Sequence, residues 1–273
     1  METFIKKTEP LFAFSSVLAI FMFIQSAGGM FFPNLYHDSN EIIASWRGND
    51  LVTLFAAIPM FIFALIYSQR ESVFAKYVWF SMLFYAFYNN CYYLFGASIN
   101  YFFFVYIAIF ILSLISLLII TANYHALTIE SNFTKSKTLR VFVVFTLLIF
   151  GSIMTVMWVS EWLKFVIYGS KPVIPGMNEG YSLVAAMDLT TQIPVMFIGA
   201  VLLWRRKALG YLLSFVSTIS NTVYLLVLIV FCPFAEKAGI VKAWDGLPLF
   251  STLFVLCLGS SILFFKNTKK LII

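Results

Sequence analysis

Long apolar segments alternate with short polar stretches along the whole chain. Each segment carries few charged side chains and falls within the roughly 17 to 25 residues that an α-helix needs to cross the hydrocarbon core of a membrane. The segments are residues 11–32, 51–67, 73–95, 101–122, 141–159, 183–204, 209–231 and 247–265. They predict an all-α fold, a polytopic transmembrane helical bundle of about eight spans, with residues 1–273 forming a single integral membrane domain.

Basic residues are distributed unevenly over the connections between these segments. The connections on the side of both termini carry Lys6, Lys7, Arg70, Lys76, Lys135, Lys137, Arg140, Arg205, Arg206, Lys207, Lys266, Lys269 and Lys270, and the opposite connections carry Arg47, Lys164, Lys171, Lys237 and Lys242. Because cytoplasmic connections are enriched in Lys and Arg, this pattern predicts a multi-pass protein of the cell membrane with both termini in the cytoplasm. The tryptophans lie near predicted span ends, as in an aromatic belt: Trp46, Trp79, Trp158, Trp162, Trp204 and Trp244.

The composition excludes several classes of protein. Only 11% of the residues are charged, while 62% are apolar, and typical globular proteins carry about 25% charged residues. The basic residues behind the net charge of +6 are spread over the connections between the spans, and they do not form a nucleic-acid-binding patch. Cys91, Cys232 and Cys257 lack the spacing of a zinc site or a thiol pair, and His37 and His125 are expected on opposite membrane faces. The sequence therefore predicts no cofactor, no metal site and no nucleic-acid partner.

Two short stretches, about half the chain apart, resemble each other. The sequence DLVT begins at Asp50 and DLTT begins at Asp188, and an Ile-Pro pair follows each of them. The two Ile-Pro pairs are 135 residues apart, and each proline is expected to kink its helix. A parallel repeat of four plus four helices, with halves at residues 1–137 and 138–273, accounts for this spacing. The distance from Asp to Pro differs between the halves, however, and coincidence in apolar sequence of low complexity is the commoner explanation of such a match.

Polar side chains inside predicted spans mark either functional sites or hydrogen bonds between helices. Asp188 lies about five residues inside its span, and Gln192, four residues later, shares its face. Asp50 follows Asn49 and is predicted at the N-terminal end of its helix, where the helix dipole favours a carboxylate. The other intramembrane amides lie in the same outer half of the bilayer. The candidate ligand-binding residues are Asp188, Gln192, Asp50, Asn89, Asn90 and Asn221.

This set of residues predicts a polar pocket open to the outer face. Either of the two longest outer connections, residues 33–49 and 160–181, is a candidate to cap it, although such connections are more commonly only solvated loops. The first hypothesis is a non-enzymatic membrane protein that binds or moves a small or lipid-like ligand through that pocket. The second is a membrane-embedded enzyme acting on a lipid-like substrate, with Asp188 or Asp50 as acid or base. The third is a structural subunit of a membrane complex, in which the polar side chains only join helices. The pattern favours a protein that is not an enzyme, and no catalytic residue is assigned.

Three stretches resemble a family of bacterial polytopic membrane proteins of uncharacterised function. They are WRGNDLVTL from Trp46, YYLFGA from Tyr92 with Asn100 after it, and LLWRRK from Leu202 followed by Gly210 and Tyr211. The likeness spans most of the chain but rests on short motifs. It implies a protein of the bacterial cytoplasmic membrane, and it implies no catalytic residue.

Overall fold

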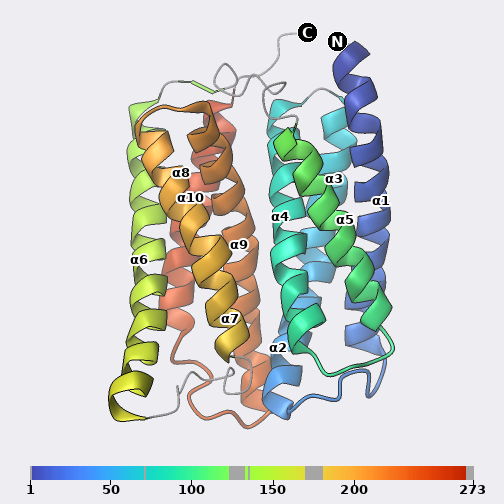
Figure 1. Cartoon of the computed structure of the whole chain (residues 1–273), viewed down its shortest axis with the longest axis vertical. Coiled ribbons are helices and arrows are strands. Elements are labelled where there is room, and N and C mark those ends of the chain that lie inside the picture. The colour runs from blue at the N-terminus through green and yellow to red at the C-terminus, as the bar shows by residue number, and fades with distance from the viewer. Residues whose placement is uncertain (1, 71, 123–132, 135, 170–180, 269–273) are drawn as a thin grey trace.

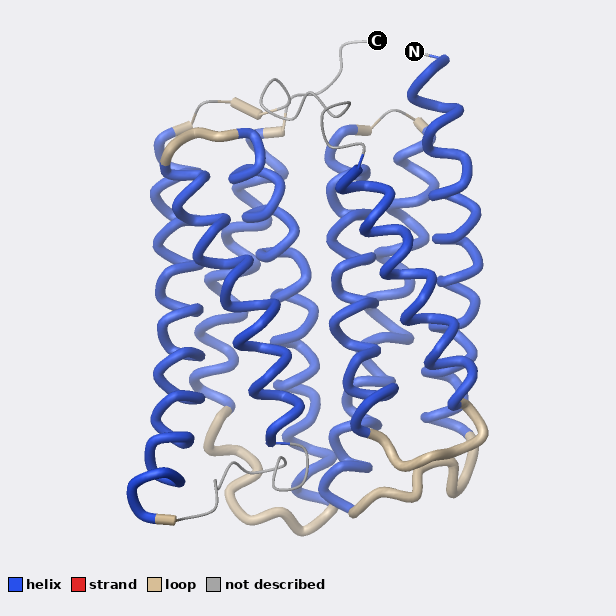
Figure 2. The backbone as a smooth tube through the Cα atoms, viewed as in Figure 1, coloured by secondary structure: helices blue, strands red, loops and turns tan. Residues whose placement is uncertain are grey.

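The computed structural model describes residues 2–70, 72–122, 133–134, 136–169 and 181–268. These residues form the all-α bundle that the apolar segments predict. No strand occurs among them, although Phe133 and Thr268 form one isolated antiparallel bridge. The helices are α1 (Glu2–Phe31), α2 (Asn40–Val52), the π-helix η1 (Thr53–Ala57), α3 (Ile58–Gln69), α4 (Val73–Gly96), α5 (Phe103–Ala122), α6 (Lys137–Tyr168), α7 (Tyr181–Met187), the π-helix η4 (Asp188–Gln192), α8 (Ile193–Trp204), α9 (Ala208–Lys237) and α10 (Leu247–Asn267) (Figures 1 and 2).

In the described part of the chain, eight continuous helical segments cross the bundle, because α2, η1 and α3 form one segment and α7, η4 and α8 form another. Seven of these segments are long and apolar enough to span a membrane. The remaining one, α4, has 24 residues but carries several tyrosines and two asparagines, and most of it is buried among the other helices. The chain is therefore a polytopic membrane protein whose least apolar long helix is enclosed by the rest.

The helices divide into two halves that lie side by side, α1 to α5 in one and α6 to α10 in the other (Figure 1). Within each half the four helical segments form a closed ring, in which the first and third segments both pack on the second and fourth. Between the halves, α2 and α4 pack against α9, and α4 also packs against α7. Helices α4 and α9 therefore occupy the centre of the molecule.

The same backbone landmarks recur in the two halves at a constant spacing. The starts of three elements in the first half are each followed, 135 residues later, by the start of an element in the second half. The pairs are η1 at Thr53 with η4 at Asp188, α3 at Ile58 with α8 at Ile193, and α4 at Val73 with α9 at Ala208. The two halves thus share both their ring of contacts and the positions of these landmarks.

Each π-helix ends at an Ile-Pro pair. The backbone N–H of Ile58 donates to the carbonyl of Thr53, and that of Ile193 donates to the carbonyl of Asp188, five residues earlier in each case. In a regular α-helix the proline ring clashes with the carbonyl four residues before it, and proline has no N–H to donate. A π-turn widens the helix at that point. The distortion expected at the two prolines therefore takes the form of a π-turn within an unbroken helical segment.

The start of the second helical segment differs from the prediction. Helix α2 begins at Asn40, after Ser39 as N-cap residue, and continues through η1 into α3. The interpretation of Asp50 as a group at the N-terminal end of its helix is therefore wrong, because Asp50 lies ten residues beyond Asn40. The apolar pattern misses this part of the helix because its residues mix polar and apolar types, and it belongs to the stretch predicted as the outer connection 33–49.

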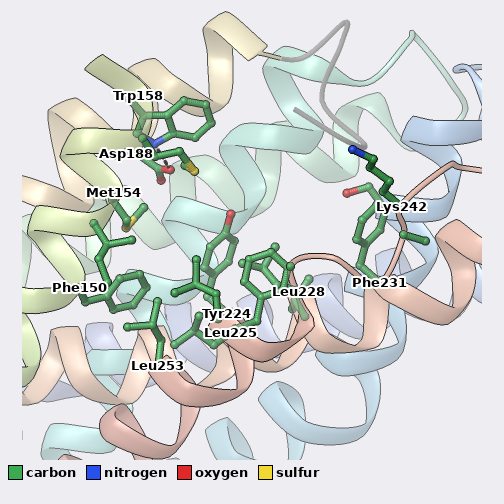
Figure 3. A pocket seen from close by; sticks show the side chains of 18 residues that line it. Phe150, Met154, Trp158, Asp188, Tyr224, Leu225, Leu228, Phe231, Lys242 and Leu253 are labelled. Carbon is green, nitrogen blue, oxygen red and sulfur yellow. Dashed lines mark hydrogen bonds between the residues drawn. The ribbon is translucent and has the colours of Figure 1, made fainter. Parts of the chain in front are cut away.

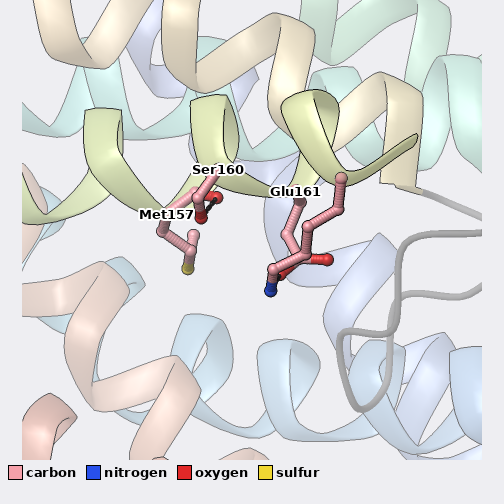
Figure 4. Close-up of polar contacts among 4 residues, drawn as sticks. Met157, Ser160 and Glu161 are labelled. Atoms are coloured by element: carbon pink, nitrogen blue, oxygen red, sulfur yellow. Dashed lines mark hydrogen bonds and ion pairs between the residues drawn. The ribbon is translucent and has the colours of Figure 1, made fainter. Parts of the chain in front are cut away.

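Helix α6 also extends beyond its apolar segment, from a predicted end at residue 159 to Tyr168. In its last turns Lys164 Nζ lies 2.5 Å from Glu161 Oε1, and Ser160 Oγ donates to the carbonyl oxygen of Met157 at 2.9 Å (Figure 4). The helix ends at Gly169, whose φ of 64° lies in the left-handed region that glycine adopts readily. The predicted outer connection 160–181 is correspondingly shorter, and residues 170–180 lie outside the described part.

Aromatic side chains join the two halves toward the end that carries both termini. The ring centroids of Phe74 and Tyr77 on α4 lie 5.5 and 5.3 Å from that of Phe215 on α9. Phe133 stacks on Tyr211 of α9 at 5.2 Å. Such pairs stabilise a contact by about 0.5–1.5 kcal/mol beyond the burial of their area. The halves therefore share an apolar junction at this end, and the polar residues of α4 lie further along the helix.

The first turn of α9 requires glycine at position 210, where it lies against the end of α8. A Cβ atom there would lie 2.2 Å from the backbone nitrogen of Leu203 and 2.3 Å from the carbonyl carbon of Leu202. These are backbone atoms, which cannot move aside as the end of a flexible side chain does. We therefore expect Gly210→Ala to lower the free energy of unfolding by about 1–3 kcal/mol. Thermal unfolding in detergent would measure this as a lower midpoint. Gly259→Ala is the control, since its nearest neighbour, Cε1 of Phe142, lies at an ordinary contact distance of 3.4 Å, and equal midpoints for the two variants would contradict the prediction.

Candidate functional site

One side of α4 carries most of the polar groups in the centre of the bundle. Tyr85, Tyr88, Asn89, Tyr92 and Tyr93 follow the three- and four-residue spacing that places residues on one broad helix face. All five side chains are buried. Their hydroxyl and amide groups bond to side chains of α2, η1 and η4. Helix α4 thus reaches both intramembrane carboxylates.

Asp188 is the first residue of η4 and is only 2% exposed. The Tyr88 hydroxyl donates to its Oδ1, and the indole Nε1–H of Trp158 donates to its Oδ2 at 2.8 Å. The Tyr88 oxygen in turn accepts a hydrogen bond from the Tyr92 hydroxyl. The carboxylate therefore connects η4 and α6 of the second half to α4 of the first half, and its donors are neutral groups.

Asp50 is fully buried in α2. The Tyr36 hydroxyl donates to its Oδ2 at 2.6 Å, and the Tyr93 hydroxyl donates to its Oδ1 at 2.9 Å. Gly29 of α1 lies directly against it, since a Cβ atom there would be 1.9 Å from Asp50 Oδ2. Tyr36 lies in the connection before α2, and burial, together with the nearby Asp50 carboxylate, raises the pKa of Tyr36 well above its ordinary value. Tyr36 therefore stays a neutral donor. Asp50 is enclosed by Gly29, Tyr36 and Tyr93.

A second polar cluster joins α2 and η1 to α4. Asn49 Nδ2 donates to Oδ1 of Asn89 at 2.6 Å, and the Tyr85 hydroxyl donates to Oδ1 of Asn49 at 3.3 Å. The Thr53 and Tyr85 hydroxyl oxygens lie 2.9 Å apart. The amide of Asn89, a predicted ligand-binding residue, is therefore engaged in a contact between helices.

The remaining predicted residues lie in two separate places. Asn221 Nδ2 donates to Gln192 Oε1 at 3.4 Å and to Ser217 Oγ at 3.1 Å, within the second half. Asn90 faces α5 instead, and its Nδ2 donates to the carbonyl oxygen of Tyr106 at 2.7 Å. The structure thus pairs Gln192 with Asn221, but it does not gather the six predicted residues into one pocket.

Two cavities lie beside these polar clusters. The larger, of about 160 Å³, is bounded by α6, α9, α10 and the connection between α9 and α10. Its wall is mostly apolar; Asp188 and Trp158 lie at one end, and the exposed Lys242 lies at the other (Figure 3). The smaller, of about 80 Å³, lies between the halves, against α2, α4, α7 and α9, and it shares Tyr224 with the larger one. Of the six predicted site residues, Asp188 alone lines either of these two cavities.

The aromatic partners of the carboxylates are the functional residues that the sequence patterns missed. The belt interpretation places Trp158 and Trp46 at the membrane surface, but both are buried and donate through Nε1, to Asp188 and to Asp38 respectively. A belt tryptophan faces the lipid headgroups, so the interpretation is wrong for these two residues and also for the buried Trp79, whose Nε1 donates to Ser15 Oγ. The regular spacing of tyrosines along α4 is the signal that could have revealed Tyr88 and Tyr93.

Metal-binding side chains are scattered through the described residues. No three His, Cys, Asp or Glu side chains within this part of the chain form a group that could hold a metal ion. The three cysteines, Cys91, Cys232 and Cys257, are free and buried. His125 lies outside the described residues.

Comparisons with known proteins identify no family. No family model, no curated protein and no solved structure matches the chain. The structure establishes a helical protein with seven membrane-length apolar helices among its described residues, and the resemblance to a bacterial membrane protein family stays a prediction. The function is accordingly inferred from the cavity and the residues that line it.

Removing the Tyr93 hydroxyl should destabilise the protein. Asp50 is fully buried, so Tyr93→Phe leaves its Oδ1 without the donor that it has in the native structure. The loss of a partner for a buried polar group costs about 1–3 kcal/mol, and we expect a lower midpoint in thermal unfolding. Tyr101→Phe is the matched control, because Tyr101 is 88% exposed. A midpoint for Tyr93→Phe that equals that of the control would show that the bond contributes nothing.

Proposed function

We propose that this membrane protein binds a small or lipid-like ligand in the larger cavity, between α6, α9 and α10. The observation that carries the proposal is a mostly apolar cavity within the bundle that has a carboxylate, an indole and a phenol in its wall. Ligand sites are typically concave and mainly apolar, with a few polar groups that orient the ligand. Asp188, Trp158 and Tyr224 are groups of this kind.

The other predicted site residues support a structural role instead. Asp50, Asn89 and Gln192 are buried, bond to side chains of other segments and line neither cavity. Hydrogen bonds between membrane helices contribute about 0.6 kcal/mol each on average. We infer that these residues hold the helices together, and that Asp188 alone combines such a bond with a place in the cavity wall.

We propose that the cavity lies on the outer side of a bacterial cytoplasmic membrane and that both termini are cytoplasmic. The cavity adjoins the connection between α9 and α10, at the opposite end of the bundle from the termini (Figure 1). Basic residues are enriched on the cytoplasmic side of membrane proteins. Those of the described helices and turns at the terminal end are Lys6, Lys7, Arg70, Lys76, Lys137, Arg140, Arg205, Arg206, Lys207 and Lys266, against Arg47, Lys164, Lys237 and Lys242 at the other end. The resemblance of the three sequence stretches supports the bacterial assignment.

Reporter fusions test this orientation. Alkaline phosphatase, which becomes active only after export, should be inactive when fused after residue 273 and active when inserted at Gly239, between α9 and α10. The expectation follows from the excess of basic residues at the terminal end. A fluorescent protein fused after residue 273 should fluoresce, as the control for expression. Active phosphatase at the C-terminus would contradict the proposed orientation.

We further propose that the two halves are a duplicated four-helix unit, related by an axis along the membrane normal. The constant spacing of helix starts and π-helices supports this proposal. The contacts between the halves are also reciprocal, because α2 packs on α9 as α7 packs on α4. Sites in duplicated membrane proteins tend to lie where the repeats meet. The Asp188 carboxylate, which bonds to Tyr88 of the other half, lies at such a contact.

Filling the larger cavity should remove ligand binding. Leu253 lines the cavity and is 3% exposed, whereas Val255, on the same helix, is 64% exposed. An apolar cavity of about 150 Å³ holds a benzene molecule, so 2-phenylethanol is a neutral probe of suitable size. We expect calorimetric titration in a neutral detergent to show binding to the wild type and to Val255→Trp, and none to Leu253→Trp. Absence of binding to the wild type, or equal binding to the two variants, would contradict the proposal.

A further inference from the structure

Asp188 has no cationic partner among the described residues, although it lies inside the bundle. Its hydrogen-bond donors, Tyr88 and Trp158, are both neutral, and no ion pair involves it in this part of the chain. A carboxylate inside the hydrocarbon region is costly unless a cation or a proton neutralises it. The larger cavity, whose wall includes Asp188, is a place from which a cation can reach the carboxylate.

Two polar aromatic residues, Trp158 and Tyr224, line the same cavity as this carboxylate. Trp158 bonds to Asp188 directly, and Tyr224 packs edge-to-face on Tyr88 with ring centroids 5.4 Å apart. Aromatic faces attract cations, and the indole face does so most strongly. A cavity whose wall holds a carboxylate, an indole and a phenol therefore favours an organic ammonium group over a neutral or anionic group of the same size.

The volume of the cavity limits what can accompany the ammonium group. The cavity measures about 160 Å³, close to the roughly 150 Å³ that accommodates benzene in an apolar protein interior. The rest of the wall carries apolar side chains that include Phe150, Met154, Leu225, Leu228 and Leu253 (Figure 3). The ligand inside the cavity should therefore have an apolar body about as large as a phenyl ring.

We propose that the larger cavity binds a small organic ammonium ion with an aryl or alkyl body, and that Asp188 is its counter-ion. The proposal rests on the proposed ligand-binding function and names the chemical class of the ligand. Lys242 is the cationic residue that lines the same cavity, but Figure 3 places it beyond Tyr224 and Leu228 from Asp188. It is exposed at the rim, where water and salt screen its charge.

The other intramembrane carboxylate cannot take the same role. Both carboxylates accept hydrogen bonds from neutral aromatic donors, but Asp50 lines neither cavity, and Gly29 lies against its Oδ2, so that neither cavity leads a cation to it. Asp188 is the first residue of η4. The first residue of η1, 135 residues earlier in the first half, is Thr53, which is neutral. The chain should therefore bind one ammonium ion, in its second half.

Three probes of matched shape test the proposal. We would titrate 2-phenylethylammonium, 2-phenylethanol and phenylacetate into the wild-type protein at neutral pH, in a neutral detergent, and measure binding by calorimetry. We expect one ammonium probe per chain, bound about tenfold or more tightly than the alcohol, because close buried charge pairs typically contribute at least that factor. Phenylacetate should bind most weakly. Equal affinity for the ammonium and the alcohol would overturn the ammonium proposal and leave the proposed function intact, whereas no binding of any probe would overturn both.

A pair of variants locates the charge that is responsible. Asp188→Asn keeps the shape of the side chain but removes its charge, so the preference for the ammonium over the alcohol should be lost while the alcohol still binds. Asp245→Asn makes the same change at an exposed residue of the connection between α9 and α10 that does not line the cavity, and it should keep the preference. A preference that persists in Asp188→Asn would overturn the assignment of the counter-ion. Should Asp188→Asn fail to fold, the probe series on the wild type still decides whether the protein prefers the ammonium probe to the alcohol.

Discussion

Helix α4 carries the hydroxyl and amide groups that allow two carboxylates to lie inside an apolar bundle. A polar group in hydrocarbon needs a partner from the protein itself, and α4 supplies Tyr93 to Asp50 and Tyr88 to Asp188. These bonds run to α2 on one side and to η4 on the other. Displacing α4 would therefore leave buried groups unpaired in both halves. This requirement explains why the least apolar of the long helices lies at the centre, where protein rather than lipid surrounds it.

The two halves are joined differently toward the two ends of the bundle. Toward the terminal end, Phe74, Tyr77 and Phe215 form an apolar junction whose contacts depend on shape. Toward the other end, hydrogen bonds with defined donors and acceptors connect α4 to Asp188, and these depend on distance and direction. Hydrogen bonds specify the register of two helices more narrowly than apolar contacts do. The relative position of the halves is thus most narrowly specified at the level of the cavities, which lie beside these bonds.

The helices were predictable from the sequence because an apolar run of membrane length has few other ways to satisfy its backbone. Their ends were less predictable. The first turns of α2 lie beyond the apolar run and are held by tertiary contacts, such as the close approach of Gly48 to the backbone of Phe231 on α9. Such contacts leave no periodic signal in the sequence, and for this reason the helical position of Asp50 was misjudged.

The candidate site was predictable only in part, for a related reason. A carboxylate inside a span stands out in any sequence, so Asp188 was found. Its partners are a tyrosine and a tryptophan, residue types that also occur at membrane surfaces and in cores. Which of them bonds to Asp188 depends on which faces of α4, α6 and η4 meet, and that is a property of the packing of distant helices.

The two halves differ in the residue that begins the π-helix, and this difference indicates why the second half carries Asp188. The π-helix and the proline after it recur 135 residues apart, with Thr53 in one half at the position of Asp188 in the other. Thr53 satisfies its hydroxyl by a bond to Tyr85 and requires no counter-ion. The backbone of this element therefore forms with a neutral residue at that position, and forming it does not require a carboxylate. The packing of the helices alone does not account for a carboxylate that the fold does not require, whereas the proposed ammonium ligand would account for it, because the carboxylate has neutral donors and a cavity beside it.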